Sequence, residues 1–290
     1  MNSKTKFIKH FLKSPTAVFS VVMLLVLGGS ALFAPLLAPH NPYDLKSFSL
    51  MDRLLPPVWE DEGDDNFLLG TDEQGRCILS SIMYGLRSSF LVGFGVVFIS
   101  LAFGALMGLC AGYFGGVADS AIGRIMDMLL AFPSFLIAVL ILGIVKHQGI
   151  LVLIMAMSIC SWVRYARVAR GNVLVVKKQE YVDASRSIGA GNVRILLMHI
   201  LPNSIGTLFV IGSVDLGMII VQESTLSFLG IGVPLTMPSL GMMISSGYTQ
   251  LFSGVWWVVT FPGLVLSALV LAVNLLGDWL RRELNPRLNN

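Results

Sequence analysis

Charged residues are scarce in this 290-residue sequence, at 13% against 55% hydrophobic residues. Soluble domains carry about 25% charged residues, roughly twice this share. A water-soluble fold of this length could not bury so much apolar surface, so we expect the lipid bilayer to be its solvent. The formal net charge of +3 is also small, and it gives no indication of a nucleic-acid partner.

The sequence also lacks the motifs of common catalytic sites. Its cysteines, Cys77, Cys110 and Cys160, are widely spaced and form neither a disulfide framework nor a metal-binding CxxC pair. The four histidines are equally scattered. No GxxxxGK(S/T) phosphate loop occurs, and no HExxH or GxSxG. We therefore expect no catalytic residues, no cofactor and no metal in this chain.

Long apolar runs are abundant, and six of them are long enough to cross a membrane as helices. Their approximate limits are 17–37, 90–113, 125–145, 149–166, 204–222 and 256–276. The lysine-rich start before the first run is also typical of a signal peptide. A signal core has about 7–15 residues, whereas this run has about 20, so we favour an uncleaved first span. The third and fourth runs form a tight hairpin around Lys146 and His147.

The distribution of Lys and Arg predicts the orientation, because cytoplasmic connections carry an excess of them. The basic residues at the expected inner connections are Lys4, Lys6, Lys9, Lys13, Arg167, Arg170, Lys177, Lys178, Arg186, Arg194, Arg281, Arg282 and Arg287. The 223–255 stretch has none, and the first connection is mainly acidic. Both termini and the 167–203 segment are thus expected in the cytoplasm.

These features predict an all-α membrane protein with six transmembrane helices. Its expected parts are a cytoplasmic segment at 1–16, the first transmembrane helix at 17–37, an extracytoplasmic acidic loop and interfacial helix at 38–89, a five-helix core at 90–280 and a cytoplasmic tail at 281–290. Gly104, Gly108, Gly112 and Gly116 lie four residues apart, which predicts a smooth helix face for close packing. That face serves either a sliding interface or static packing.

The connection between the fourth and fifth spans, residues 177–203, is here called the elbow. Its sequence predicts a short helix at about 179–188, a break at 189–191, and a more apolar helix that leads to Pro202. Small side chains at Ala184 and Ser185 let a partner surface come close. The elbow therefore has the form of a projecting element that docks on another protein.

The elbow resembles the EAA loop of binding-protein-dependent ABC importer permeases. That pattern is Glu-Ala-Ala, then Gly after three residues, then Ile-x-Leu-Pro after nine more. The residues that match in register are Ala184, Gly189, Leu201 and Pro202. The departures are Asp183 for Glu, Ser185 for the second Ala and His199 for Ile.

Four further stretches narrow the resemblance to the C-type permease subunit of dipeptide/oligopeptide/nickel ABC importers. They are Leu-Gly-Thr-Asp-Glu-Gln-Gly-Arg at 69–76, Tyr-Gly-Leu-Arg-Ser-Ser at 84–89, Glu-Ser-Thr-Leu-Ser-Phe-Leu-Gly at 223–230, and the set Trp-Trp at 256–257, Phe-Pro-Gly at 261–263 and Asn-Leu-Leu-Gly-Asp at 274–278. Cys77 replaces the group's Asp after the first stretch, and Leu240 replaces its Trp before Gly241.

The resemblance implies the type I ABC importer permease fold in a bacterial inner membrane. It also implies a second permease subunit that completes the pathway, two cytoplasmic ATPases that bind ATP and Mg, and an extracytoplasmic substrate-binding protein. The implied ATPase-coupling residues are Asp183, Ala184, Ser185, Gly189, Leu201 and Pro202. The cargo stays open among dipeptides, oligopeptides, nickel and metal chelates.

Ionisable residues inside spans need a partner or a wet cavity. Asp215 either contacts the ammonium group of a peptide in the pathway or pairs across helices. Glu223 and Ser224 form either a gate or hydrogen bonds at a helix end. Asp127 is expected to pair with Arg124 one turn before it.

Two further expectations concern the outer interface and the energy source. The 256–257 tryptophan pair is expected to anchor the sixth span in an aromatic belt. A different class of function is a secondary transporter that is driven by an ion gradient through Asp215, although the sequence shows no internal repeat that would favour it. An enzyme embedded in the membrane is a third class, and the missing catalytic motifs speak against it.

Overall fold

The computed structural model describes residues 9–44, 49–145, 149–234 and 236–284, and these are mostly helical. The elements are α2 (Pro15–Leu32), α3 (Ala34–Leu37), η2 (Leu50–Asp52), α4 (Ile78–Phe114), α5 (Gly116–Leu130), α6 (Ser134–Ile144), α7 (Ile150–Val176), α8 (Glu180–Ser187), α9 (Asn192–Ile195), the π-helical turn η3 (Leu196–Ile200), α10 (Leu201–Phe228), α11 (Leu240–Gln250), η4 (Leu251–Ser253) and α12 (Trp257–Leu284). One isolated β-bridge joins Thr71 and Cys77.

Several expectations concern residues outside these ranges. They are the first part of the 1–16 segment, the hairpin residues Lys146 and His147, and the end of the 281–290 tail. The helical stretch 9–13, which precedes α2, belongs to the residues that the structure describes. There His10 Nδ1 is 3.0 Å from the Glu283 carboxylate, so this stretch contacts the end of α12.

Five helices are long and apolar enough to cross a membrane, and a bent pair brings the number to six. The five are α2, α4, α7, the run from Asn192 to Phe228, and α12. The bent pair is α5 and α6, which meet at 83°. The third expected span, at 125–145, thus falls on a helix pair that bends at Pro133, because Pro133 lacks a backbone N–H and disfavours the helical conformation at Phe132. Pro133 is the N-cap of α6.

The expected boundary between an interfacial helix and the second span at residue 90 is also absent. α4 continues without a break from Ile78 to Phe114, over 37 residues. At 1.5 Å per residue it is about 55 Å long, and the hydrocarbon core of a bilayer is about 30 Å thick. α4 therefore extends well beyond the apolar layer.

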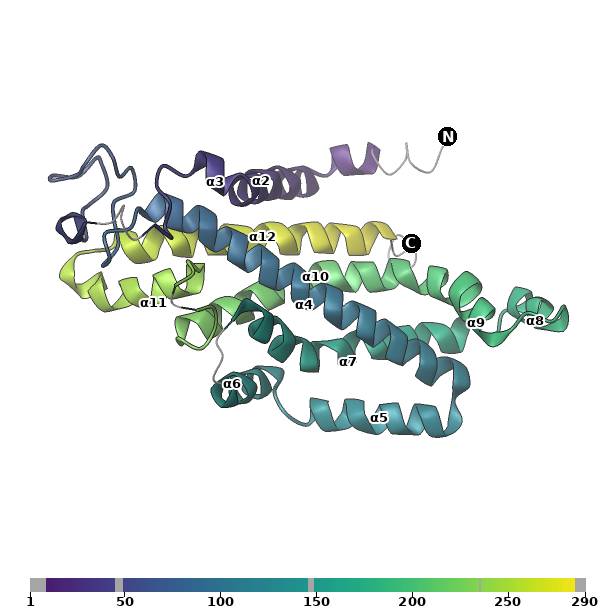
Figure 1. Ribbon diagram of the computed structural model, residues 1–290. Helices are drawn as coiled ribbons and strands as arrows, with labels where there is room; N and C mark the ends of the chain where they lie inside the picture. Colours follow the sequence, from purple (N-terminus) through teal and green to yellow (C-terminus); the bar gives the residue numbers. More distant parts are fainter. Residues whose placement is uncertain (1–8, 45–48, 146–148, 235, 285–290) are drawn as a thin grey trace.

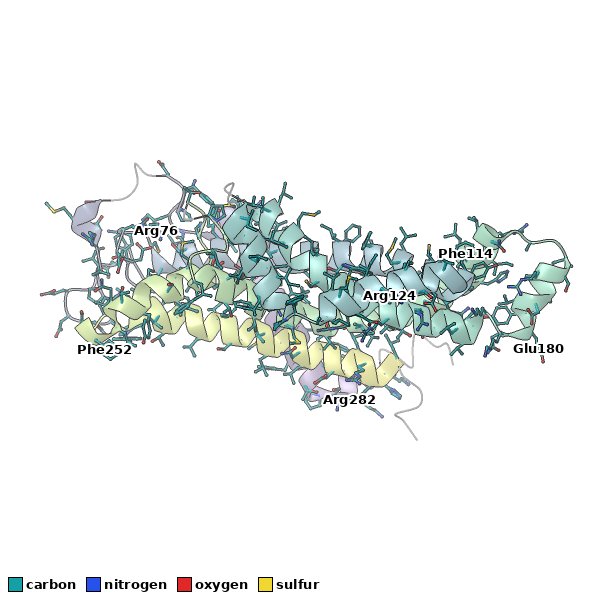
Figure 2. The ribbon with its side chains drawn as sticks, turned by 90° about the horizontal axis from the view of Figure 1, so that it is seen from below. Arg76, Phe114, Arg124, Glu180, Phe252 and Arg282 are labelled. Carbon is teal, nitrogen blue, oxygen red and sulfur yellow. The ribbon has the colours of Figure 1, made fainter. Side chains whose placement is uncertain are left out.

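The long helices lie side by side, α5 and α6 lie along one side of them, and the other short helices lie toward the two ends of the bundle (Figure 1). α8 and α9 project from one end, toward which α12 finishes, while α11 and the described residues 39–44 and 49–77 lie at the other. Glu180 at the start of α8 accordingly lies far from Arg76 and Phe252 (Figure 2). α4 packs on both α7 and α10, and α2 lies against α12 and α4.

Glycine residues in α4 allow the backbones of α4 and α7 to come into direct contact. A Cβ atom on Gly104 would lie 2.4 Å from the carbonyl oxygen of Trp162, and one on Gly108 would lie 2.3 Å from that of Ala166. A Cβ atom on Gly112 would likewise clash with the Val173 side chain. The predicted close packing is confirmed for these three glycines, and the partner is a helix of the same chain. Gly116 lies beyond the end of α4, where its φ is +52°.

The 69–76 motif forms a hydrogen-bonded turn directly before α4. The buried Asp72 carboxylate accepts the backbone N–H groups of Gln74 (2.8 Å) and Arg76 (2.9 Å) and the Nε–H of Arg76 (2.7 Å). Gly70 and Gly75 have φ angles of +80° and +76°, which glycine adopts without strain. The motif therefore fixes how the outer segment enters α4.

The two tryptophans at the start of the last helix hold this outer segment. Trp257 is only 6% exposed, and its Nε1–H donates to the carbonyl of Thr71 at 3.2 Å. The Nε1–H of Trp256 donates to the Glu60 carboxylate at 3.0 Å. The expected aromatic belt is thus wrong for Trp257, because its indole is buried against protein.

Candidate coupling elbow and pathway site

The elbow is anchored by buried apolar side chains, and its exposed surface carries both polar and apolar side chains. Val182 in α8 is fully buried among Leu109, Val173, Ile195 and Ile200, which come from α4, α7, α9 and η3. Asp183 and Ala184, which follow it, are exposed. An exposed helix that is fixed to several elements of the bundle passes a force to all of them.

Glycine ends α8 as the sequence predicts. Gly189 has a φ of +85°, whereas Gly191 has a φ of −69°. A Cβ atom added to either residue would meet no other atom within 4 Å, so the two differ in backbone conformation and not in space. Only glycine adopts the positive φ of Gly189 at low cost. Ile188 beside it is 87% exposed. Leu201 and Pro202 then begin α10, and proline is well tolerated in a first helical turn.

The two departures from the EAA pattern at Ser185 and His199 contact each other. The Ser185 hydroxyl lies 3.1 Å from Nε2 of His199. The hydroxyl also donates to the carbonyl of Tyr181 at 2.8 Å. A polar contact therefore stands where the family pattern has Ala and Ile, so the two changes compensate for each other.

Two hydrogen bonds join the elbow to the end of α4. The Nζ group of Lys177 donates to the carbonyl of Gly112 at 2.7 Å, in the last turn of that helix. A cation is stabilised there because carbonyl groups at a helix C-terminus carry partial negative charge. The hydroxyl of Tyr113 donates to Oδ1 of Asn192 at 2.9 Å. Two parts of the elbow are therefore tied to one helix.

Three arginines, one per turn of α7, each pair with an aspartate on another helix. The pairs are Arg164 with Asp215, Arg167 with Asp127 and Arg170 with Asp119. Arg170 binds both carboxylate oxygens, at 2.5 and 2.7 Å. The expected pairing of Asp127 with Arg124 is wrong, because Arg167 reaches it at 2.8 Å from α7.

The Arg164–Asp215 pair joins α7 to α10 at the wall of two cavities. The larger cavity has a volume of about 940 Å³ and the smaller one about 100 Å³. Both residues line both cavities. Asp215 thus pairs across helices, as one of the two expectations required. It also borders both cavities, and its contact with a peptide ammonium group stays a prediction.

Glu223 and Ser224 lie in a buried polar cluster between α4 and α10. The Glu223 carboxylate is fully buried and accepts hydroxyl groups from Ser89 (3.0 Å), Ser227 (2.8 Å) and Ser224 (3.4 Å). Gly241 in α11 leaves no room beside them, because its Cβ would lie 2.1 Å from the Ser224 carbonyl oxygen. This geometry favours the hydrogen-bonding role, and the gate stays a prediction.

Sequence reasoning missed Arg164 as the partner of Asp215. The signal was present, because Arg164, Arg167 and Arg170 recur every three residues along one helix face. Three cations in such a row need three acceptors nearby. The spacing does not say which aspartates supply them.

An apolar helical bundle with a projecting elbow, and with an ion pair at the wall of two cavities, is compatible with a membrane permease. The chain belongs to the family described as the binding-protein-dependent transport system inner membrane component, whose model matches residues 81–290. Residues 5–57 match the N-terminal TM domain of oligopeptide transport permease C.

The chain is similar along nearly its whole length to curated permease proteins. It is 38% identical to the dipeptide transport system permease protein DppC of Haemophilus influenzae, over 96% of this chain and 93% of that protein. It is 40% identical to the di/tripeptide transport system permease protein DppC of Pseudomonas aeruginosa, over 98% and 92%. It is 37% identical to the glutathione transport system permease protein GsiD of Pectobacterium atrosepticum, over 98% and 91%.

Two solved structures share the fold. An inward-facing MetNI methionine ABC transporter matches with a TM-score of 0.55 and 19% identity, over 71% of this chain and 96% of that chain. An amino acid ABC transporter with histidines matches with a TM-score of 0.53 and 14% identity, over 70% and 94%. The chain is thus a multi-pass permease with the type I ABC importer fold. The ion-gradient alternative through Asp215 finds no support in these relationships.

Proposed function

We propose that this chain is one permease subunit of an ATP-driven importer for dipeptides or other small peptides. The peptide cargo is suggested by the names of the relatives, which concern dipeptides, di- and tripeptides and glutathione. A second homologous permease completes the pathway, and an extracytoplasmic binding protein delivers the peptide. Two cytoplasmic ATPases bind ATP and Mg, so this chain performs no hydrolysis itself.

The elbow carries this proposal. Its α8 exposes Asp183 and Ala184 while Val182 is fixed in the bundle, which suits a handle that an ATPase can grip. When ATP draws the two ATPases together, the handles of the two permeases approach and the bundle turns toward the other side of the membrane. Such a cycle requires ATP and peptide to favour different states of the bundle.

We further propose that the chain lies in a bacterial inner membrane with both termini and the elbow in the cytoplasm. The basic residues of the elbow and the acidic outer segment support this orientation. Asp215 borders the pathway, and Glu223 and Ser224 are proposed as residues that link the pathway helix α10 to α4.

Substitutions at the two glycines of the elbow test the coupling. Gly189→Val places a β-branched side chain at a φ of +85°, which costs more than about 1–2 kcal/mol. Gly191→Val is the matched control, because this residue has an ordinary φ of −69°. We expect Gly189→Val to lower peptide uptake by the complete transporter about tenfold or more while the protein still inserts. Asp183→Lys should also lower peptide uptake.

The readouts are ATP-driven uptake of labelled dialanine and ATP hydrolysis, measured on the same proteoliposomes. Loss of uptake with continued hydrolysis is the expected result for uncoupling. If Gly189→Val and Asp183→Lys both import peptide at the wild-type rate, the elbow is not the handle.

A further inference from the structure

The Arg164–Asp215 pair differs from the other two pairs on α7 in what surrounds it. In the described part of the chain, the residues of the other pairs border neither of the two cavities. The side chain of Asp215 is 7% exposed and that of Arg164 is 56% exposed. The carboxylate therefore lies in the wall, and the guanidinium reaches into open space.

The two cavities lie on either side of this pair. The larger one runs from the pair along α10 to Pro202 in the elbow, and its 940 Å³ is within the range of about 300–1,000 Å³ that small-ligand sites have. The smaller one reaches Leu130 and Ser134 at the bend between α5 and α6. Its 100 Å³ holds about three waters at roughly 30 Å³ each. A solute that passes from one cavity to the other meets the pair.

The larger cavity also offers hydrogen-bonding groups. Asn172 borders it, and the buried Nδ2 of this residue has no hydrogen-bond partner among the described residues. Thr207 borders it from α10. A buried donor without a partner is uncommon, and a solute carbonyl group would satisfy this one.

We propose that Arg164 and Asp215 form a transit site for a solute that carries both an ammonium and a carboxylate group. The solute carboxylate takes the place of Asp215 on the guanidinium, and the solute ammonium takes the place of Arg164 on the Asp215 carboxylate. A small peptide with two free ends is such a solute. This inference rests on the proposed function, which supplies the peptide.

The selectivity of the site follows from charge balance. Separating the pair without a replacement leaves two charges unpaired, and the cost is greatest for the Asp215 carboxylate, whose side chain is only 7% exposed. A solute with one charge pairs with one of the two residues, and a zwitterion pairs with both. The guanidinium fork also binds a carboxylate through two parallel hydrogen bonds. The site therefore favours peptides with free ends over blocked peptides of equal size.

Neutralising both residues together separates this role from a merely structural one. We compare uptake of labelled dialanine by the complete transporter, in proteoliposomes that enclose ATP, for the wild type, Arg164→Gln, Asp215→Asn and the double variant. A transit site predicts that the double variant stays about tenfold or more below the wild type, because each hydrogen bond to a charged group is commonly worth about this factor. The matched control is the double variant Arg167→Gln/Asp127→Asn, which is expected to import normally.

A structural tie predicts a different result, since the double variant leaves no charge unpaired. Uptake near the wild-type rate in the Arg164→Gln/Asp215→Asn variant therefore overturns the transit site. This outcome differs from a wild-type transporter that imports no peptide with ATP, which contradicts the proposed function and the transit site together.

Labelling of Cys160 gives a readout that leaves Arg164 and Asp215 unchanged. Cys160 borders the small cavity, and Cys77→Ser and Cys110→Ser leave it as the only cysteine. We expect dialanine to slow the reaction of Cys160 with N-ethylmaleimide in the complete transporter, and N-acetyl-dialanine amide to leave the rate unchanged. Equal protection by the two peptides contradicts the transit site.

Discussion

At the scale of single residues, the contact between Ser185 and His199 shows how two departures from a family pattern can compensate. Ser185→Ala leaves the imidazole without its partner at 3.1 Å, and His199→Ile removes the same contact from the other side. We expect each single variant to lower stability and the double variant to recover part of the loss. The coupling energy should be about 0.5–1.5 kcal/mol.

Thermal unfolding of the purified chain in detergent measures this coupling as a double-mutant cycle. Ser187→Ala is the matched control, because the Ser187 hydroxyl donates within α8, to the carbonyl of Asp183 at 3.0 Å. Its effect should add to that of His199→Ile. Simple additivity for Ser185→Ala as well would show that the contact contributes nothing.

Glu223 differs from Ser185 and His199, because its single carboxylate accepts hydrogen bonds from several serine hydroxyl groups. Three serine hydroxyl groups donate to its fully buried carboxylate, so Glu223→Ala leaves all three without an acceptor and opens a void. We expect a loss of about 3 kcal/mol or more, seen as a lower midpoint of thermal unfolding. Thr225→Ala, whose exposed hydroxyl donates within its own helix at 2.8 Å, should change the midpoint little. A midpoint for Glu223→Ala as high as this control would refute the role of the cluster.

At the scale of helices, the packing of α4 on α7 depends on residues that have no side chain. Gly108→Val brings its new atoms within 2.3 Å of the Ala166 carbonyl oxygen and 2.7 Å of the Ala169 Cβ, so the helices must separate. We expect a loss of about 3 kcal/mol and a low yield of folded protein, measured by gel filtration in detergent and by thermal unfolding.

Gly171 supplies the control for this prediction within α7 itself. No atom lies within 4 Å of a Cβ built there, and alanine is a better helix former than glycine by about 1 kcal/mol. Gly171→Ala should therefore be neutral or slightly stabilising. Should Gly108→Val unfold at the same temperature as Gly171→Ala, the close approach of the two helices would be disproved.

The helices show which part of the fold can be predicted from the sequence. The close face of α4 was predictable because four-residue spacing of glycine has one physical meaning in a helix. The bend at Pro133 was not, since the apolar composition continues on both sides of it and hides a change of direction. The apolar run that starts at residue 90 suggested a boundary there, yet α4 continues through it, because polar side chains are compatible with a helix that leaves the membrane.

At the scale of the whole molecule, the separation of the elbow from the outer segment predicts a sided labelling pattern. Ile188 and Phe252 are 87% and 89% exposed. They lie just after α8 and α11 in the chain, and these two helices lie at opposite ends of the bundle (Figure 1). In a variant without the three native cysteines, Ile188→Cys should react with a membrane-impermeant maleimide only in inside-out vesicles. Phe252→Cys should react only in right-side-out vesicles.

Reaction of both cysteines from one side would refute the transmembrane arrangement. Reaction of Ile188→Cys from outside alone would reverse the orientation and place the elbow beyond the reach of cytoplasmic ATPases.

The candidate site was predictable only where it is local in sequence. The break at Gly189 and the start of α10 at Pro202 depend on neighbouring residues, and their spacing sufficed. The Arg164–Asp215 pair joins positions 51 residues apart, so only the tertiary structure brings them together. The same limit explains why the partner of Asp127 was predicted wrongly. Arg124 was expected because it is close in sequence, whereas Arg167, the partner in the structure, lies 40 residues away.

The continuity of α7 makes it a lever that joins the elbow to the interior. Arg164 and Lys177 stand at positions 13 residues apart on it, which is about 20 Å at 1.5 Å per residue. A tilt of about 10° around the Lys177 end therefore swings Arg164 sideways by about 3.5 Å. That travel is longer than a hydrogen bond, so a modest pull at the elbow would be enough to separate the Arg164–Asp215 pair.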